Sequence, residues 1–568
     1  MKTAHIILLC MSAALIALLC SCSGGKSTSA DEPVKDTDLK TGDVAWCGPP
    51  QKEFGSVDFA TSCSEKVKKD FNMGLALLHS FEYDEAEKAF ARVIQIEPDC
   101  AMAYWGMAMS AYHMLWAPPS QSELIKGAKA IAVAQRISKK TKRESEYINA
   151  LAAFYADWDT KDHKTRTLAH EKAMEKNYLS HLGDREAAIF YALSLDASAS
   201  PSDKTFKNQK KAFRILSSLY PGQPDHPGIV HYIIHSYDYP ELALEALPAA
   251  RKYASIAPSS AHAQHMPSHI FTRLGLWEEN IKSNLIATSS AKCYAENAGL
   301  KGHWDEELHG MDYLMYSYLQ QGDNRLAKGQ LDYLKTIKEV SPVNFKVAYA
   351  YAAIPARYVL ENKNWKEAAE MKLLPEAFPW EQYPWQKAIV QFTRTLGLAN
   401  IDKIPAAKAE LRRLSISHDT LTSRGLTYEA NQVKIQLTSA EAWILFKEGK
   451  NNQALKMMTL AANMEDQTEK HPVTPGEVVP ARELLGEMLL QMNKPDEALT
   501  AFDANLKKHP NRLNGLYGAA VAAEQRDPAK SVMYFKKLAD IAGSVNSDRM
   551  EVIKAKAAVK TGNSITNN

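Results

Sequence analysis

Apolar residues recur at helical spacing along most of this chain, and the pattern itself repeats. In "FNMGLALLHSFEYDEAEKAFARVIQIEP" a small residue, Gly74, is followed by Ala86, by Phe90 four positions later and by Pro98. Two later stretches also have a small residue, a second residue four positions later and a closing proline. One holds Ala246, Ala250 and Pro258, and the other holds Ala498, Phe502 and Pro510. A small residue lets two helices cross closely, a larger one fills the seam, and proline ends the second helix. The pattern therefore predicts consecutive helix pairs.

This spacing resembles the tetratricopeptide repeat family, and about ten units of that kind can be placed between roughly residues 64 and 542. Regions 120–200 and 380–430 keep a helical pattern but match the repeat less well. The sequence contains neither the strand alternation nor the glycine-rich loop of a nucleotide-binding fold. We therefore expect an all-α fold, a right-handed α-solenoid of helix pairs over residues 67–560, in which each repeat buries its apolar face against its neighbours.

The chain begins with the pattern of an export signal. One lysine and an apolar run from Ile6 to Leu19 precede small residues and cysteines, which is the layout of a secretory signal peptide. As a helix the run would be about 21 Å long, too short for a hydrocarbon core of ~30 Å. The segment "LCSC" resembles a bacterial lipobox and makes Cys22 the expected lipidated residue. We expect a signal peptide over 1–21, a flexible tether over 22–45, and lipid anchoring to a membrane on the exported side of a bacterial cell envelope.

Charge and cysteines narrow the expectations further. The chain has 68 lysines and arginines against 66 aspartates and glutamates, a net charge of +2, so we expect no nucleic-acid partner. Export permits disulfides, and a bond between Cys47 and Cys63 would close an N-terminal loop over 46–66. Cys100 and Cys293 fall within helical pattern and are expected to be buried thiols.

Histidines gather in the middle of the repeat array. The stretch "HAQHMPSH" places His262, His265 and His269 at i, i+3 and i+7, on one face of a helix. In a solenoid of this type the first helix of each pair lines the concave surface, and these three positions face inward. The inward positions of this repeat and its two neighbours, over residues 226–320, hold His231, His235, His262, His265, His269, His309, Asp312 and Tyr316.

This clustering predicts a transition-metal site. Histidines one turn apart have Cβ atoms about 5–6 Å apart, and neighbouring helix axes lie about 8–10 Å apart. Imidazoles from adjacent helices would therefore meet around one ion, Zn, Cu or Fe, at ~2.0–2.1 Å per bond. Asp312 would compensate charge or accept a hydrogen bond from an imidazole N–H. A ladder of structural hydrogen bonds is the alternative interpretation of the same histidines.

Two further residues are expected to face the concave groove. Tyr316 follows the histidines, and Arg357 occupies an inward position in "YAAIPARYVLENKNW". We expect these side chains to contact a protein or peptide partner, or a small ligand, bound in the groove.

Functions of different classes fit these expectations. The segments "DCAMAYWGMAMS", "HYIIHSYDYPELA" and "HMPSHIFTRLGLW" resemble a group of bacterial secreted tetratricopeptide proteins, which supports the fold and implies no particular activity. One candidate is a membrane-anchored binding scaffold with a histidine-rich metal site in its groove. Another is a metal-dependent enzyme, in which the histidines leave one coordination position open for water and Asp312, Glu306 or Tyr316 shuttles protons. A metal-free groove that binds peptide or glycan is the third.

Overall fold

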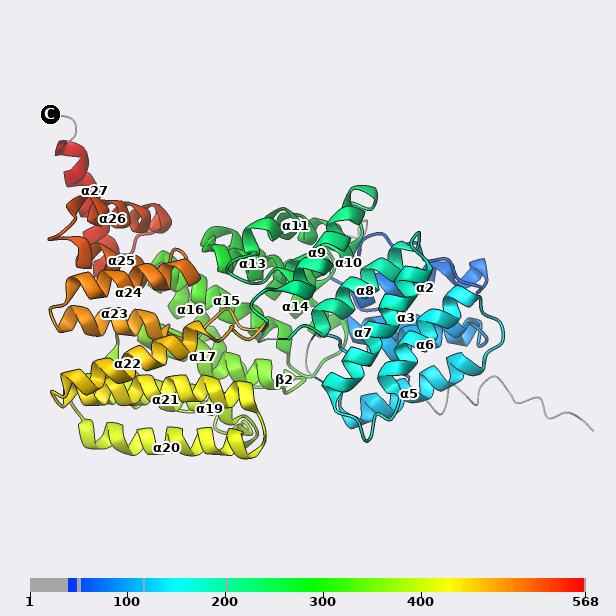
Figure 1. Cartoon of the computed structure of the whole chain (residues 1–568), viewed down its shortest axis with the longest axis horizontal. Helices are drawn as coiled ribbons and strands as arrows, with labels where there is room; N and C mark the ends of the chain where they lie inside the picture. Colours follow the sequence, from blue (N-terminus) through cyan, green and yellow to red (C-terminus); the bar gives the residue numbers. More distant parts are fainter. Residues whose placement is uncertain (1–38, 48–52, 116–117, 201–202, 566–568) are drawn as a thin grey trace, which may run out of the picture.

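The computed structural model describes residues 39–47, 53–115, 118–200 and 203–565, which form an array of helices (Figure 1). Ser120 and Thr141 begin their helices with a capping box, in which the cap hydroxyl accepts the N–H of a glutamate three residues on. The N-terminal part contains α2 (Glu65–His79), α3 (Tyr83–Ile96), α4 (Ala101–Ser110), α5 (Gln121–Arg136), α6 (Lys142–Tyr155), α7 (His163–Ser180), α8 (Arg185–Ala197), α9 (Lys207–Leu219) and the 3-10 turn η1 (Tyr220–Gly222).

The middle of the chain carries the histidines and a short pair of parallel strands. His303 pairs with Val340 and Trp304 with Ser341. The elements here are α10 (Pro227–Ser236), α11 (Ala243–Ile256), α12 (Ala261–His265), α13 (Pro267–Leu274), α14 (Trp277–Asn297), β1 (His303–Trp304), α15 (Asp305–Gln321), α16 (Asn324–Thr336) and β2 (Val340–Ser341).

The C-terminal part returns to helix pairs. Its elements are α17 (Phe345–Glu361), α18 (Trp365–Glu370), η2 (Trp380–Gln382), α19 (Pro384–Asn400), α20 (Ile404–Ser423), α21 (Thr427–Lys447), α22 (Asn451–Asp466), α23 (Ala481–Gln491), α24 (Pro495–Lys508), α25 (Leu513–Ala523), α26 (Pro528–Ala542) and α27 (Met550–Ile565). No helix of the described residues is long and apolar enough to cross a membrane.

Aromatic side chains fill the seams between repeats, as the sequence predicts. A Cβ on Gly74 of α2 would lie 3.0 Å from the Phe90 ring, and one on Gly106 of α4 would lie 2.5 Å from it. Phe502 of α24 packs in the same way against Gly486 of α23 and Gly518 of α25. One ring therefore closes the contact between three successive helices, which is why glycine stands on both sides of it. The predicted all-α solenoid of helix pairs is confirmed.

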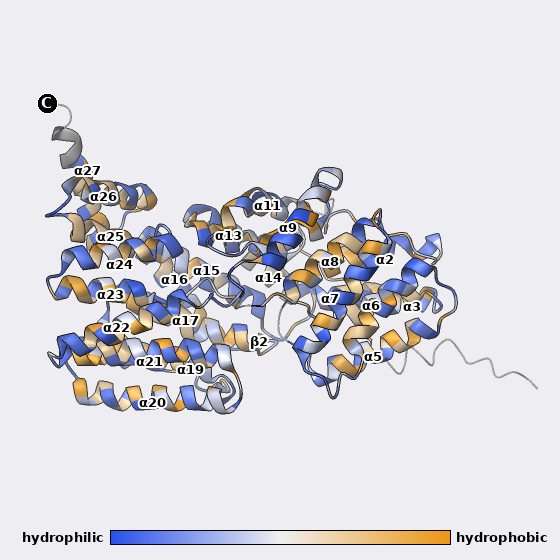
Figure 2. Cartoon of the chain, in the orientation of Figure 1, coloured by the Kyte–Doolittle hydropathy of each residue, from blue (hydrophilic) through white to orange (hydrophobic). Residues whose placement is uncertain are grey.

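Two large apolar cores run through the described array, and the histidine-bearing helices lie where they meet. The first core extends from Phe54 to Phe271 and the second from Leu308 to Ala555. Hydrophobic and hydrophilic residues alternate along the helices of both parts (Figure 2). Helices α10, α12, α13 and α15 therefore bring polar side chains into the junction between two apolar cores.

The N-terminal segment is attached more closely than the sequence predicts. Residues 1–38, with the expected signal peptide and Cys22, lie outside the described residues. Residues 39–45, expected to be the end of a free tether, bind α3: the backbone N–H groups of Lys40 and Ala45 donate to Glu87 at 2.7 Å and Glu85 at 2.6 Å. This part of the predicted tether belongs to the folded array.

The predicted disulfide between Cys47 and Cys63 is wrong. Cys47 is bonded to Cys293 of α14, with Cα atoms 5.9 Å apart, because residues 39–47 run back across the array to that helix. Cys63 is bonded to Cys100, with Cα atoms 5.3 Å apart and a sequence separation of 37 residues. These two cysteines precede α2 and α4, the first helices of neighbouring repeats, so one repeat step brings them together. Cys100 and Cys293 are not free thiols.

Candidate metal centre

Four helices position the six histidines. Pro227 starts α10, where its missing N–H costs no helical hydrogen bond. Ser260 caps α12 by accepting the N–H of Ala263 at 3.0 Å. Met266, between α12 and α13, keeps helical dihedral angles (φ −53°, ψ −35°), so Pro267 does not turn the two short helices away from each other. The predicted placement of the "HAQHMPSH" histidines along one helical run is therefore retained.

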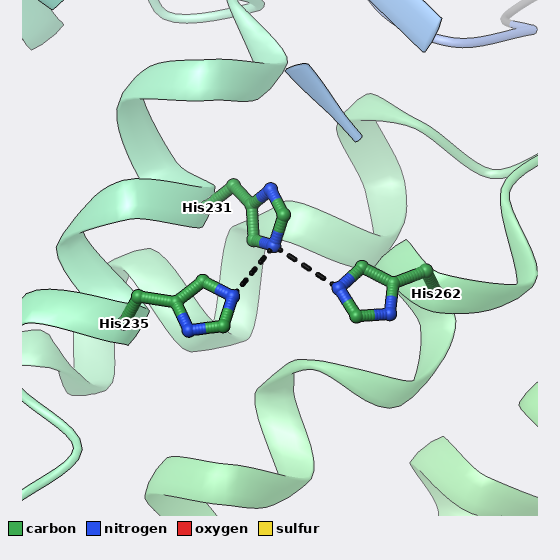
Figure 3. Close-up of side chains that lie close together, drawn as sticks. All are labelled: His231, His235 and His262. Atoms are coloured by element: carbon green, nitrogen blue, oxygen red, sulfur yellow. Dashed lines mark hydrogen bonds between the residues drawn. The ribbon is translucent and has the colours of Figure 1, made fainter. Parts of the chain in front are cut away.

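His231, His235 and His262 form the first triad (Figure 3). Their Nε2 atoms converge: His231 Nε2 lies 3.1 Å from His235 Nε2 and 3.2 Å from His262 Nε2. His231 and His262 are buried and His235 is half-buried. The first two come from one turn of α10, and the third comes from the start of the next lining helix.

His265, His269 and His309 form the second triad, and all three are buried. His265 Nε2 lies 3.1 Å from His269 Nε2. The His309 ring, on α15, lies 4.2 Å from the His265 ring between centroids. The six predicted histidines are therefore brought together, but as two groups of three and not around a single point.

Hydrogen bonds from the outer ring nitrogens fix the protons of two histidines of the second triad. His265 Nδ1 donates to Asn284 Oδ1 at 2.7 Å, and His269 Nδ1 donates to Asp238 Oδ2 at 3.1 Å. The Asn284 amide is oriented because its nitrogen donates to the backbone oxygen of Asn280 at 2.9 Å. A neutral imidazole with its proton on Nδ1 carries a lone pair on Nε2. Two lone pairs therefore face each other across the 3.1 Å contact.

The first triad has one nitrogen fixed in the same way. His231 Nδ1 lies 2.6 Å from the backbone oxygen of His79, which can only accept, so the proton is on Nδ1. The single lone pair of His231 Nε2 then faces two other Nε2 atoms. At most one of them can donate a well-aligned hydrogen bond to it.

Burial favours the neutral form of several of these imidazoles. It lowers the pKa of His231, His265 and His309 well below the usual 6.5, and neighbouring imidazoles add to the effect. Burial also lowers the pKa of His269 to about 4, although Asp238 beside it acts in the opposite direction. Neutral imidazole is the form that binds metals.

Carboxylates and cations surround the two triads. Asp238 bonds Arg273 Nε at 2.8 Å and Lys470 Nζ at 2.8 Å, in addition to His269. At the other end Glu306 Oε2 lies 3.9 Å from His262 Nδ1. Lys346 forms ion pairs with Glu306 and with Asp305, the latter at 2.7 Å. Despite burial, the Lys346 ammonium and His262 hold the pKa of Glu306 well below its usual range.

Asp312 is not a metal ligand in this arrangement, which corrects the prediction. Its Oδ1 accepts from Arg357 Nε at 2.9 Å, and it belongs to neither triad. The predicted groove contacts are corrected in the same way: Arg357 is 0% exposed, and Tyr316 is 2% exposed and accepts from Arg512 at 2.9 Å. A buried guanidinium is stable only when paired. Arg357 pairs with Asp312, and Arg512 donates to Tyr316. Asp312, Tyr316 and Arg357 are therefore held inside the protein and do not face the groove.

The concave groove beside the histidines is filled by the chain itself. Residues 467–480, the loop between α22 and α23, reach back to the middle of the array (Figure 1, orange). Arg357 donates to the backbone oxygens of Gly476 and Glu477, each at 2.7 Å. Tyr313 donates to the backbone oxygen of Val473 at 3.1 Å. The histidines therefore line a closed junction and not an open groove.

A third buried histidine group lies beside the first triad. His79 Nε2 and His226 Nε2 lie 3.0 and 2.7 Å from the two oxygens of Glu186. Tyr232 donates its hydroxyl to His79 Nδ1 across 2.9 Å. Despite burial, the two histidines hold the pKa of Glu186 well below its usual range. In this group a carboxylate accepts from both imidazoles.

The sequence pattern does not identify the residues that orient the imidazoles. Asp238 follows His235 by three positions, a spacing that places it near the same helix end. Asn284 on α14 and Lys470 in the 467–480 loop have no spacing relation to the histidines. Only the folded backbone brings these two residues to the site.

Comparisons with known proteins add little to this picture. No family model matches the chain, and no curated protein matches its sequence. Yeast Tom70 aligns at 13% identity with a TM-score of 0.32, over 88% of this chain and 96% of that chain. The APC/C hetero-tetramer Cut9-Hcn1 aligns at 12% identity with a TM-score of 0.27, over 88% of this chain and 97% of that chain. Similarity this loose carries no argument about function.

Proposed function

We propose that this protein is an exported, lipid-anchored helical-repeat scaffold whose buried histidines hold a transition metal. The observation that carries the proposal is the contact between His265 Nε2 and His269 Nε2 at 3.1 Å, with both Nδ1 protons donated outward. Two facing lone pairs repel each other. Such a contact is stable when a cation lies between the nitrogens.

A proton is the other cation that would relieve this repulsion. One shared proton would make either ring an imidazolium, but burial lowers the pKa of His265 well below 6.5 and that of His269 to about 4. Near neutral pH a proton is therefore a poor occupant. A metal ion bonded to both nitrogens satisfies the same lone pairs without protonating either ring.

The chemistry of the ligands favours Zn, Cu or Fe. Every expected ligand is an imidazole, which suits these metals. Their outer nitrogens bond a carboxylate, an amide oxygen and a backbone oxygen, provided by Asp238, Asn284 and His79. Partners of these kinds orient metal-bound histidines and raise their basicity.

Export and anchoring are supported by cysteine usage. Two disulfides, Cys47–Cys293 and Cys63–Cys100, fit an oxidising compartment. The "LCSC" segment offers Cys22 for lipidation. A Cys22→Ser variant is expected to move the protein from the membrane fraction to the soluble fraction, and unchanged fractionation would contradict the anchor.

A protein or peptide partner would contact the helix array outside the closed junction. Residues 467–480 already occupy the groove next to the histidines. The repeat scaffold would thus present its remaining faces to a partner, while the metal stays inside.

Metal analysis of protein purified without a histidine tag tests the proposal. We expect stoichiometric Zn, Cu or Fe, and a chelator should lower the melting temperature of the wild type. His265→Ala should weaken metal binding at least tenfold, or about 1.4 kcal/mol, and should melt early with or without chelator. His418→Ala is the matched control, because His418 lies on α20 and its imidazole pairs with the neighbouring Asp419.

The hydrogen-bond ladder makes a different prediction. In that case His265→Ala loses about 1–3 kcal/mol of stability through unpaired buried partners, and the chelator leaves the wild-type melting temperature unchanged. That pair of results, together with no stoichiometric metal, would sink the proposal.

A further inference from the structure

We propose that the six histidines hold two metal ions, one in each triad, and not one shared ion. This inference rests on the proposed function, because it assigns ligands within the same cluster. It specifies how many ions are bound, which histidines bind each ion and how the two sites are related.

The repeat builds both triads by the same rule. Each consists of two histidines one turn apart, followed by one histidine from the start of the next lining helix. In the first triad the pair is His231 and His235, and in the second it is His265 and His269, each 34 residues later. One repeat step therefore converts the first triad into the second, with His309 in the place of His262.

The rule stops on both sides, which limits the number of sites to two. One step after the second triad, the positions of the pair hold Asp312 and Tyr316, and these are bonded to Arg357 and Arg512. One step before the first triad, Gly228 stands where the third histidine would be, and its missing side chain leaves room for His79.

Distances within each triad fit one ion. Nitrogens bonded at ~2.0–2.1 Å in tetrahedral geometry are roughly 3.3–3.4 Å apart. The Nε2 atoms of the first triad lie 3.1 and 3.2 Å apart, and those of His265 and His269 lie 3.1 Å apart. These contacts already have nearly the spacing that an ion requires, and the ligand atoms of each triad all lie within 4.8 Å of one another.

Distances between the triads do not fit a shared ion. Any two nitrogens bonded to one ion at ~2.0–2.1 Å lie within about 4.2 Å of each other. In the described residues, ligand atoms that all lie within 4.8 Å of one another place His231, His235 and His262 in one group and His265, His269 and His309 in another, while His79, Glu186 and His226 form a third group.

Charge around the junction indicates which ion fits best. Three carboxylates, on Asp238, Asp305 and Glu306, are balanced by the three cations of Arg273, Lys346 and Lys470. Two divalent ions would leave four added positive charges in this buried site. Two monovalent copper ions would leave half as many, and imidazole is a suitable copper ligand. Cu(I) is therefore the first probe, and Zn(II) is the second.

A titration of the metal-free protein tests the division into two sites. Anaerobic Cu(I), measured against a coloured chelator, should fill two sites per chain in the wild type. His262→Gln and His309→Gln each remove the third ligand of one triad, so each variant should keep one tight site. The double variant should keep none, and His418→Gln should keep both. Circular dichroism of each variant checks that the array is still folded.

A paramagnetic probe gives a readout that does not depend on affinity. With Cu(II) loaded, electron paramagnetic resonance of the wild type should show broadening from two neighbouring ions. Either single variant should give the narrow spectrum of an isolated ion.

The outcomes separate this inference from the proposed function. If the wild type binds one ion, and either variant abolishes it, the six histidines share a single site: the inference is wrong and the proposed function stands. If the wild type takes up none of Cu(I), Zn(II) and Fe(II), both are wrong. Two ions in the wild type with one left in each single variant is the result that supports two triads.

Discussion

The second triad and the His79–Glu186–His226 group are two clusters of buried histidines that differ in their hydrogen-bond balance. Around Glu186, two imidazole N–H groups meet one carboxylate, at 3.0 and 2.7 Å. Between His265 and His269 no acceptor lies between the rings, and both protons point away from the 3.1 Å contact. Clustering and burial are the same in both. What distinguishes a candidate metal site is therefore an excess of lone pairs over donors.

The His79–Glu186–His226 group is called the balanced group, because its donors and acceptors match. Removing its acceptor should cause the largest loss of stability. Glu186→Ala leaves the His79 and His226 N–H groups buried without a partner. Leaving a buried donor without its acceptor costs about 1–3 kcal/mol. This change does so twice, so we expect a loss of roughly 2–6 kcal/mol in the free energy of unfolding, which urea unfolding would measure. Chelator should change this loss very little, whereas a strong chelator dependence would mean that Glu186 also supports a metal.

A pH titration measures the effect of burial on a histidine that belongs to neither cluster. His170 of α7 lies in the N-terminal part, and burial lowers its pKa from 6.5 to about 3. As the pH falls, His170 takes up a proton in the unfolded state before it does so in the folded state. Its contribution to the free energy of unfolding is therefore fully present above pH 6.5 and is lost as the pH drops toward 3. The loss is about 1.4 kcal/mol per pH unit, or about 2.7 kcal/mol between pH 6.5 and 4.5.

His170→Phe should remove this part of the pH dependence. Unfolding of both proteins at pH 6.5 and 4.5 measures the difference between their slopes. Equal slopes would show that His170 does not remain neutral in the folded state.

The fold was predictable because its signals are local. Helical periodicity and the Ala86 to Phe90 spacing report contacts within a repeat, and every repeat meets its neighbours in the same way. The six histidines were found for the same reason, since equal positions in successive repeats must face the same side.

Contacts that cross several repeats could not be predicted in this way. Cys47 joins Cys293 across 246 residues, and Lys470 reaches Asp238 across 232. No repeat spacing relates such residues. The open groove was expected because nothing in the sequence of the 467–480 loop shows that it folds back over the junction. The same loop explains why Arg357 is buried there and does not meet a ligand.

Loss of an orienting side chain should weaken the metal site by a smaller amount. Asn284→Ala removes the oxygen that holds the His265 proton on Nδ1, so the ring is free to place that proton on Nε2. Loss of such a partner typically weakens metal binding 10–100-fold, or about 1.4–2.7 kcal/mol, as measured by competition with a chelator.

Two variants sharpen this test of Asn284 as a positioning residue. Asn284→Asp keeps an acceptor for His265 and should restore most of the affinity. Ser283→Ala, on the same helix, loses a buried hydrogen bond to the Gln264 backbone oxygen but touches no imidazole. If Ser283→Ala weakens metal binding as much as Asn284→Ala, the effect of Asn284 is only structural.

The smallest expected effect belongs to the outer hydrogen bond of the balanced group. Tyr232→Phe removes the hydroxyl that donates to His79 Nδ1 at 2.9 Å and leaves the ring packing in place. Loss of one such bond costs about 0.5–1.5 kcal/mol, which thermal unfolding resolves. His79 also accepts the His231 proton, but it does so through its backbone oxygen, which this change leaves in place. Metal affinity should therefore stay within error of the wild type. A tenfold loss of affinity in Tyr232→Phe would mean that the two clusters act as one unit, and that counting donors and lone pairs separately for each is wrong.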